Sequence, residues 1–401
     1  MKNLHLFIIL TYLLAACASP LPAAASPTAA FTLTPSPTLT LTPSLTPSPF
    51  PTLTPEPVSL GTPTPSYPNG GYGPTNFPAN IDPLTGLQVA NVSLLERRPL
   101  LIKVANLPRA YRPQWGLSLA DQVFEYYIEE GTTRFAAVFL GQEASMVAPI
   151  RSGRFFDNHL INMYKANFAF GSADYRVRDL LYNQPYANRL VIESGCPPMC
   201  RFEPTSLNYL MTSTAGLTTL INKRKVSGGN GRQNLDGFLF DYTTPTQGTP
   251  ANRVYVRYSS AIYNRWDYNP STGKYERYSD TQDDFQSGKN EKYQQLTDRL
   301  TGQPISADNL VVLFVPHSYI LRKPEIVDIV MSGPGDAYLF RDGQLFTLKW
   351  YRNGIDKTMI LVDQAGKTFP MKPGNTWFEV VGSSSVIQAN PTDYRFIFKI
   401  P

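Results

Sequence analysis

Short apolar runs separated by polar turns fill the first part of the chain after residue 81. Pro99 to Ala105 is almost entirely apolar and predicts a buried strand, and Arg134 to Leu140 predicts a second one. Between them, Ser118 has the character of a helix N-cap, and the apolar positions that follow it have roughly helical spacing. We therefore predict a helix that begins after Ser118 and ends at Gly131.

The same kinds of pattern continue after this segment. They predict helices over residues 157–164 and 174–183, with a short buried strand over 167–170 between them. Strands that alternate with helices are typical of α/β or α+β proteins, in which helices pack on a sheet. The expected fold class of residues 81–236 is therefore an α/β domain.

The second half of the chain shows strand patterns. Arg253 to Tyr258 alternates as a strand, and Asn264 to Tyr278 predicts a hairpin whose loop is Asn269 to Gly273. A second hairpin is predicted from Ala337 to Trp350, and further strands at 310–315, 358–362 and 376–381. These patterns predict a smaller, mainly-β domain over residues 237–401.

The first residues have the pattern of an export signal. Lys2 precedes an apolar run that ends in Leu14-Ala15-Ala16-Cys17, which resembles the bacterial lipobox. We predict a lipoprotein signal peptide over residues 1–16, with lipid on Cys17 anchoring the mature chain to the membrane. A plain secretory signal is the alternative. Either way the expected localisation is extracytoplasmic, at the cell surface or facing the periplasm.

The segment that follows is rich in Thr, Pro and Ser. Such a composition offers no apolar face and few backbone donors. Residues 17–80 are therefore predicted to form a disordered, low-complexity linker that acts as a spacer between the membrane and the folded part.

The net charge and the few cysteines and histidines limit the kinds of partner and cofactor that we expect. A net charge of +5 is modest and does not indicate a nucleic-acid partner. Cys196 and Cys200 are expected to form a local disulfide outside the cytoplasm. The three histidines form no ligand cluster, and no phosphate-binding loop, dinucleotide fingerprint or EF-hand occurs. We therefore expect no metal and no cofactor.

Three segments resemble the YerB-like family of bacterial lipoproteins. They are RPLLIKVAN, RPQWGLSLADQVFEYYIEEGTTRF and APIRSGR, all between residues 98 and 154. The resemblance implies an N-terminal and a C-terminal domain of unknown function. Ala105 departs from the family, which usually has an aspartate there, before the asparagine matched by Asn106. The Cys196–Cys200 segment departs as a local insertion.

Arginines and acidic residues of the same region are the main candidates for a site. Asp121, Glu125 and Glu129 are spaced four apart, which would place them on one face of the predicted helix. They could form structural ion pairs with the arginines, or the arginines could bind a carboxylate or phosphate of a ligand. The ligand-binding candidates are Arg134, Arg151, Arg154, Glu125, Glu129, Asn106 and Ser172.

Two other groups of residues are candidates for chemistry. Ser152, Ser172, Asp174 and His159 suggest a serine hydrolase, but the sequence lacks the G-x-S-x-G motif. The tyrosines and the tryptophan between residues 255 and 278 are expected to pack across β strands, or alternatively to stack on sugars. We interpret the protein as a binding module of the cell envelope, for wall polymer, an anionic ligand or a protein partner. A hydrolase acting on cell-wall material is the alternative.

Overall fold

The computed structural model describes residues 67–193, 195–202 and 209–400. The predicted signal peptide, Cys17 and most of the predicted linker lie outside these residues. Residues 67–80, the last part of the predicted linker, instead belong to the folded unit, where Tyr72 pairs with Phe240 in an antiparallel bridge. Within the described residues, no helix combines the length and the apolar character needed to cross a bilayer.

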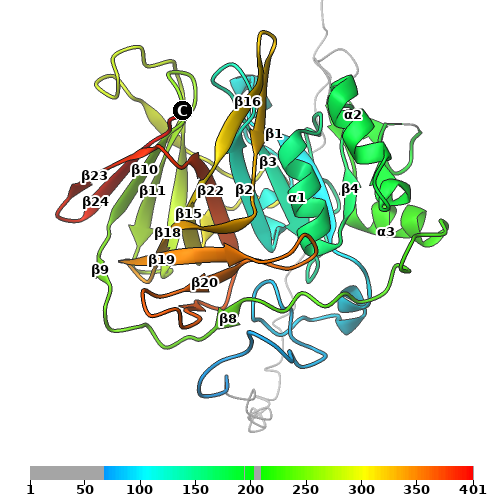
Figure 1. The fold of residues 1–401 in the computed structure, drawn as a ribbon, viewed down its shortest axis with the longest axis horizontal. Coiled ribbons are helices and arrows are strands. Elements are labelled where there is room, and N and C mark those ends of the chain that lie inside the picture. The colour runs from blue at the N-terminus through cyan, green and yellow to red at the C-terminus, as the bar shows by residue number, and fades with distance from the viewer. Residues whose placement is uncertain (1–66, 194, 203–208, 401) are drawn as a thin grey trace, which may run out of the picture. The chain divides into compact units, whose positions relative to one another are not determined.

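A mixed sheet of eleven strands forms the centre of the folded unit (Figure 1). Its strand order is β20-β19-β18-β15-β22-β2-β3-β1-β4-β5, and β9 pairs with β19. The strands are β1 Leu100–Ala105, β2 Gln122–Tyr127, β3 Thr133–Phe139, β4 Asn167–Ala169, β5 Leu190–Val191, β9 Thr249–Pro250, β15 Asn309–Val315, β18 Gly333–Arg341, β19 Gln344–Arg352, β20 Ile360–Val362 and β22 Thr376–Gly382. Both halves of the chain therefore contribute to one sheet.

Strand β22 joins the two halves. It runs parallel to β15 on one side and to β2 on the other, with Thr376 opposite both Asn309 and Gln122. All seven residues of β22 are buried. A strand from near the C-terminus thus completes the hydrogen bonding of the strand at residues 122–127.

A second sheet packs beside the first. Its order is β13-β12-β11-β10-β24-β23, with β14 paired to β12. The strands are β10 Arg253–Arg257, β11 Tyr263–Asn269, β12 Lys274–Asp280, β13 Tyr293–Gln295, β14 Ser306–Ala307, β23 Val386–Asn390 and β24 Asp393–Ile397. Two-stranded pairs complete the β structure: β16 His317–Arg322 with β17 Glu325–Ile329, β8 Leu239–Phe240 with β21 Pro370–Met371, and β6 Cys200–Arg201 with β7 Leu210–Met211.

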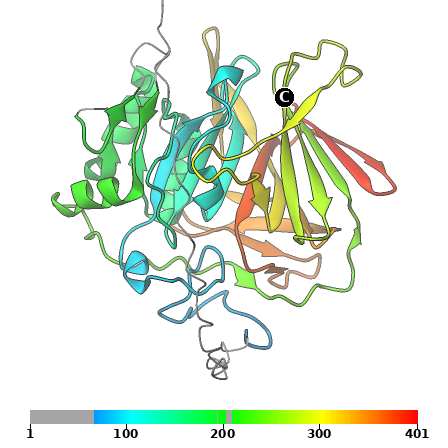
Figure 2. The same ribbon diagram turned by 180° about the vertical axis from the view of Figure 1, so that it is seen from behind.

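The α-helices of the described residues lie together at the β4 and β5 end of the main sheet (Figures 1 and 2). They are α1 Phe155–Tyr164, α2 Tyr175–Tyr182 and α3 Thr214–Asn222, and single 3-10 turns occur at η1 Val92–Glu96, η2 Arg109–Tyr111, η3 Leu117–Leu119 and η4 Ala187–Arg189. The helices predicted over 157–164 and 174–183 are confirmed. The described chain as a whole is mostly β with few helices.

The helix predicted after Ser118 is wrong, because this segment is a short 3-10 turn followed by β2. Every residue of β2 is buried, and the strand lies between β22 and β3. A strand buried on both faces shows no alternation of apolar and polar residues. Its apolar positions therefore matched a helical spacing by chance, and Asp121, Glu125 and Glu129 do not share a helix face.

Aromatic side chains fill the core between the two sheets. The rings of Trp266 on β11 and Trp377 on β22 lie 5.2 Å apart, and both side chains are buried. Tyr258, Tyr263 and Tyr275 are buried as well. The packing role that we preferred for the aromatic residues of this region therefore holds for these members of the set.

Two buried carboxyl groups lie next to each other at the start of β2. Asp121 accepts hydrogen bonds from the backbone of Leu140 and Gly141, and Asp82 accepts one from Leu84 at 2.8 Å. Burial, together with the charge of Asp121, raises the pKa of Asp82, and burial raises the pKa of Asp121 to about 6. Because the two carboxyl groups are buried and close together, the ionisation of one makes the ionisation of the other less favourable.

Replacing Asp82 by asparagine should stabilise the protein at neutral pH. The native pair has raised pKa values, so its favourable contribution is present at low pH and is lost as the pH rises through about 6. The asparagine side chain would keep the acceptor for Leu84 and remove one charge, so we expect a gain of roughly 1–2 kcal/mol at about pH 8 that vanishes near pH 4. Urea unfolding at both pH values measures it. A uniform loss of stability would contradict the shared-charge account.

Candidate functional site

A cavity of about 470 Å³ opens where β2, α1 and the β16–β17 hairpin meet. The turn after β2 contributes Glu129, and the segment before α1 contributes Ser152 and Arg154. Ser172 lies on the loop between β4 and α2, and Glu325 comes from the hairpin. Three residues that we predicted from the sequence, Glu129, Arg154 and Ser172, therefore line one cavity.

Arg154 is held in place by an ion pair. Its Nε atom lies 2.6 Å from Oε2 of Glu129, and its Nη2 atom contacts the other carboxylate oxygen. The backbone N–H of Arg154 donates to Asp157 at 2.7 Å, which starts α1. A two-point contact of this kind fixes the orientation of the guanidinium group.

Arg134 and Arg151 lack such a partner. Arg134 donates to the carbonyl of Ser152 at 2.7 Å, while the Arg151 guanidinium lies 4.6 Å from the centre of the Tyr111 ring and donates to its hydroxyl. Within the described part of the chain, neither guanidinium forms an ion pair. The exposure of both side chains is intermediate.

The charges of these arginines act on one another. Burial is the largest cause that lowers the pKa of Arg134, to about 9, and the positive charges of Arg154 and Arg151 lower it further. Glu129 opposes this effect. Arg134 stays protonated at neutral pH, and the cluster has an excess of positive charge that a bound anion would relieve.

The opposite rim of the cavity is acidic. Glu325 accepts hydrogen bonds from the Tyr127 hydroxyl at 2.8 Å and from the backbone of Glu130 at 2.6 Å. Asp174 caps α2 and pairs with Arg176 at 3.3 Å. A ligand with several negative charges would be repelled by this rim, so the cavity favours a ligand with one anionic group at its arginine end.

A buried ion pair lies behind the site, next to the start of α1. Nζ of Lys103 lies 3.1 Å from Oδ1 of Asp157, and both side chains are fully buried. The hydroxyl of Tyr126 also donates to Asp157. Burial lowers the pKa of Lys103 to about 7, although Asp157 opposes the shift, and burial raises the pKa of Asp157. This pair connects β1 to the helix that begins beside Arg154.

The residues of the hydrolase hypothesis do not form a catalytic group. The hydroxyls of Ser152 and Ser172 lie 3.1 Å apart, and in the described chain neither is hydrogen-bonded to a histidine or a carboxylate. His159 instead contacts Arg352, with Nδ1 3.4 Å from Nη1. Burial and the charge of Arg352 lower the pKa of His159 to about 4. Among the described residues, no base is therefore placed to activate either serine.

Two further candidates lie away from the cavity. Glu125 is fully buried, and its Oε2 atom lies 2.6 Å from Nη2 of Arg277 on β12. Nη1 of Arg277 lies 2.9 Å from Glu379 on β22, and Asn106 donates to Glu125 at 3.0 Å. This buried network joins the two sheets and is closed to a ligand.

Sequence analysis did not identify Arg277 or Glu379. Glu379 is the one acidic residue of the otherwise mostly apolar strand β22. A lone charge in an apolar run could have indicated a buried charged residue. The structure also joins Cys196, on the loop after β5, to Cys200, the first residue of β6, in the predicted disulfide.

Comparisons with known proteins agree with this architecture. The family model for the N-terminal domain of DUF3048, a protein of unknown function, matches residues 84–227, and the model for its C-terminal domain matches residues 254–378. The putative lipoprotein YerB of Bacillus subtilis is 29% identical over 311 residues, which cover 75% of this chain and 85% of that protein. The crystal structure of Bacillus subtilis YerB superposes with a TM-score of 0.62 at 26% identity, covering 75% of this chain and 96% of the crystallised one.

Proposed function

Because this chain belongs to the DUF3048 family, whose two domains have no assigned function, we propose a function from the site itself: the protein binds an anionic group of a cell-envelope polymer. Arg134, Arg151 and Arg154 bind the anion, and the cavity beside them holds the group that carries it. Guanidinium groups suit this role because their planar donors match carboxylate and phosphate oxygens.

One observation carries the proposal. Arg134, which bonds to Ser152 of the cavity wall, and Arg151 have no carboxylate partner in the described chain, although the charges of Arg154 and Arg151 both act on Arg134. The third arginine, Arg154, has its charge paired with Glu129. Unpaired arginines beside a cavity are typical of a site whose partner arrives from outside.

The expected location supports a polymer as the ligand. The relative from Bacillus subtilis is named a putative lipoprotein, and the sequence here predicts lipid on Cys17. A chain anchored in this way on the outer side of a membrane faces the cell wall, whose polymers carry carboxylate and phosphate groups. The predicted linker would give the site reach towards this material. The hydrolase alternative has less support, because neither serine of the cavity has a base among the described residues.

The test is co-sedimentation of residues 18–401 with purified cell-wall sacculi. The variant replaces Arg134 and Arg151 by glutamine. We expect the variant to lose about tenfold or more of its affinity, because two charged donors to the anion are removed. Its thermal stability should be unchanged or slightly higher, because the two arginines have no carboxylate to abandon in the described chain and their mutual repulsion is relieved.

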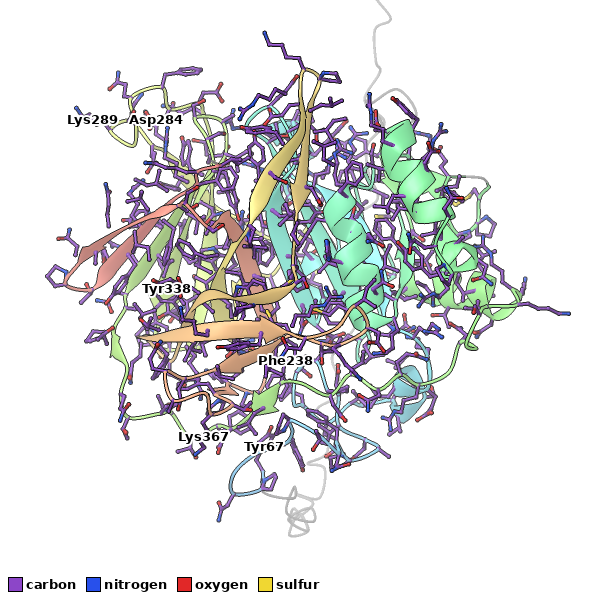
Figure 3. The ribbon with its side chains drawn as sticks, viewed as in Figure 1. Tyr67, Phe238, Asp284, Lys289, Tyr338 and Lys367 are labelled. Atoms are coloured by element: carbon purple, nitrogen blue, oxygen red, sulfur yellow. A yellow bond between two sulfur atoms is a disulfide. The ribbon has the colours of Figure 1, made fainter. Side chains whose placement is uncertain are left out.

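The control removes two positive charges elsewhere. Lys289 and Lys367 are exposed and lie far from each other on the surface (Figure 3). A double alanine variant of these lysines should bind like the wild type. Equal losses in both variants would show attraction by net charge alone and refute the site. A large loss of stability in the arginine variant would show that Arg134 and Arg151 are structural. Release of soluble wall fragments during incubation would favour the hydrolase.

A further inference from the structure

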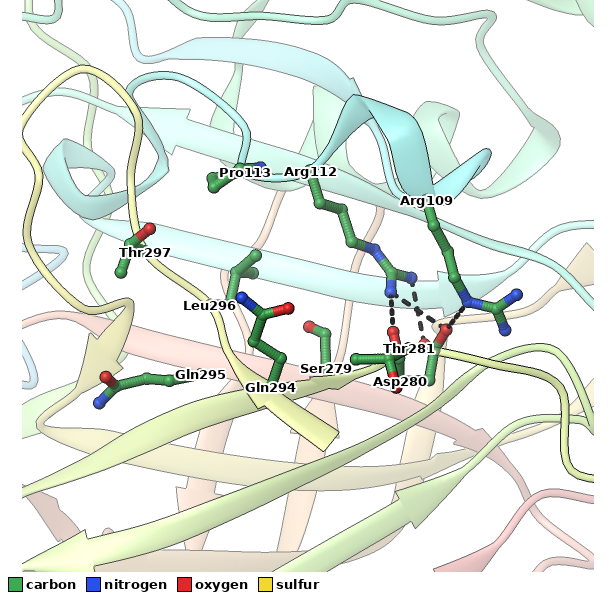
Figure 4. A pocket seen from close by; sticks show the side chains of 10 residues that line it. All are labelled: Arg109, Arg112, Pro113, Ser279, Asp280, Thr281, Gln294, Gln295, Leu296 and Thr297. Atoms are coloured by element: carbon green, nitrogen blue, oxygen red, sulfur yellow. Dashed lines mark hydrogen bonds and ion pairs between the residues drawn. The ribbon is translucent and has the colours of Figure 1, made fainter. Parts of the chain in front are cut away.

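A second cavity, of about 290 Å³, lies between the segment around η2 and the strands β12 and β13 (Figure 4). Arg109, Arg112 and Pro113 form one wall, and Ser279, Gln294 and Leu296 belong to the other. The walls come from the two halves of the chain, which are separated by more than 160 residues between Pro113 and Ser279. The cavity shares no lining residue with the arginine site described above.

The charged groups of this second cavity compensate one another. Nε of Arg109 lies 2.6 Å from Asp280, and Nη1 of Arg112 lies 3.1 Å from the same carboxylate. Arg109 also contacts Asp283 at 2.9 Å. Two arginines thus face two aspartates, and no net charge remains among these described groups to attract an anion or a cation.

An uncharged hydroxyl on the wall lacks a partner. Ser279 has a relative exposure of 4%, and its Oγ atom has no hydrogen-bond partner among the described residues. A buried hydroxyl left in this state costs about 1–3 kcal/mol. Most buried polar side chains in proteins are satisfied, so an exception on the wall of a cavity leaves a hydrogen-bonding position open to whatever occupies the cavity.

Neutral groups near Ser279 extend the set of donors and acceptors. In Figure 4 the amide of Gln294 reaches from its strand into the space between Leu296 and Ser279. The side chain of Gln294 is exposed to solvent and that of Thr297 is half-buried, so both are free to turn towards a ligand. A hydroxyl and an amide each donate and accept. Leu296 and Pro113 add apolar surface beside them.

We propose that this cavity binds a single neutral sugar residue. Sugar hydroxyls both donate and accept, so one of them would supply the bond that Ser279 lacks, and others would match the groups of Gln294 and Thr297. The C–H face of the ring would pack on Leu296 and Pro113. The volume is at the lower end of small-molecule sites, which limits the occupant to about one ring. The compensated charges exclude an acidic or basic sugar as the preferred ligand.

This inference does not depend on the function proposed for the arginine site. The probe is neutral, so Arg134 and Arg151 give it no charge to bind. The double glutamine variant of those arginines should bind the sugar like the wild type. Failure of one proposal therefore leaves the other unaffected.

Saturation-transfer NMR with N-acetylglucosamine tests the proposal, using the full-length protein in a detergent that has no sugar headgroup. We expect saturable binding by the wild type and about a fivefold or greater loss of affinity in the variants Ser279→Ala and Gln294→Ala. Ser279→Ala should unfold at the same temperature as the wild type or higher, because it removes a hydroxyl that has no partner in the described chain. Gln286→Ala is the matched control and should bind normally, because Gln286 is an exposed glutamine on the loop between β12 and β13 and does not line the cavity.

Three results would overturn the proposal. The first is no saturable binding of N-acetylglucosamine by the wild type. The second is binding that Ser279→Ala and Gln294→Ala leave unchanged. The third is equal or tighter binding of glucuronate, glucosamine or N-acetyl-trialanine amide, which would indicate an anion, a cation or a peptide as the ligand.

Discussion

Replacing Arg277 by methionine is expected to lower the free energy of unfolding by about 3–5 kcal/mol, the largest effect among the single substitutions proposed. Arg277 is fully buried and bonds to both Glu125 and Glu379, which belong to neighbouring strands of the other sheet. Without it, two carboxylates stay in the core with no cation. Guanidinium chloride unfolding at about pH 8 measures the loss.

The loss should depend on pH. Burial and the charge of Glu125 raise the pKa of Glu379 to about 7 even with Arg277 present. A raised pKa means that the protonated form favours the folded state, so this carboxyl group destabilises the fold as the pH rises through about 7. In the Arg277→Met variant we therefore expect a smaller loss at about pH 5 than at pH 8.

The matched control removes the charges together. Arg277→Met combined with Glu125→Gln and Glu379→Gln leaves none of the three buried charges, and it should recover a large part of the lost stability. A loss below about 1 kcal/mol in the single variant would contradict the buried network, and so would a triple variant less stable than the single one.

Replacing Asp157 by alanine should have the second largest effect, a loss of about 3 kcal/mol. Three groups lose their partner: the ammonium of Lys103, the hydroxyl of Tyr126 and the backbone N–H of Arg154. Lys103 would remain as a buried cation. Because its pKa is already lowered to about 7 and would fall further, the neutral amine becomes the favoured form as the pH rises. Thermal unfolding should therefore show a smaller loss at about pH 9 than at pH 6.

The double variant Lys103→Met with Asp157→Asn is the control for this pair. It removes both charges, and the asparagine side chain can still bond to Tyr126 and Arg154, so we expect it to be more stable than Asp157→Ala. Equal stability of the two variants would show that the ion pair adds nothing beyond the hydrogen bonds. A loss that grows with pH would contradict the assignment of a buried lysine.

Local patterns explain which parts of the fold were predictable. Strands β1 and β3 and the hairpin β11–β12 have apolar runs or alternation next to clear turns, and each was predicted within a few residues. Strand β2 was not, because its partner β22 lies some 250 residues further along the chain. Nothing in its own sequence shows that both faces are covered.

The residues of the candidate site also differ in how far they could be predicted from the sequence. Arg134, Arg151 and Arg154 lie within 21 positions of one another and were recognised together. The hairpin residue Glu325, which closes the cavity, is more than 160 positions away and has no signal in that region. The pairing of Glu125 with Arg277 could not be predicted either. A local stretch of sequence shows that a charged residue is present, but not which distant residue contacts it after folding.

The position of β22 near the end of the chain also determines when the main sheet can finish folding. Synthesis delivers the N-terminal end first, so β2 emerges long before residues 376–382 exist to cover its open edge. An uncovered central strand is a template for pairing with other chains. The sheet of the first half therefore stays incomplete until residues 376–382 are available to pair with β2. A ribosome that stops early releases a product that cannot close its sheet and is open to proteolysis.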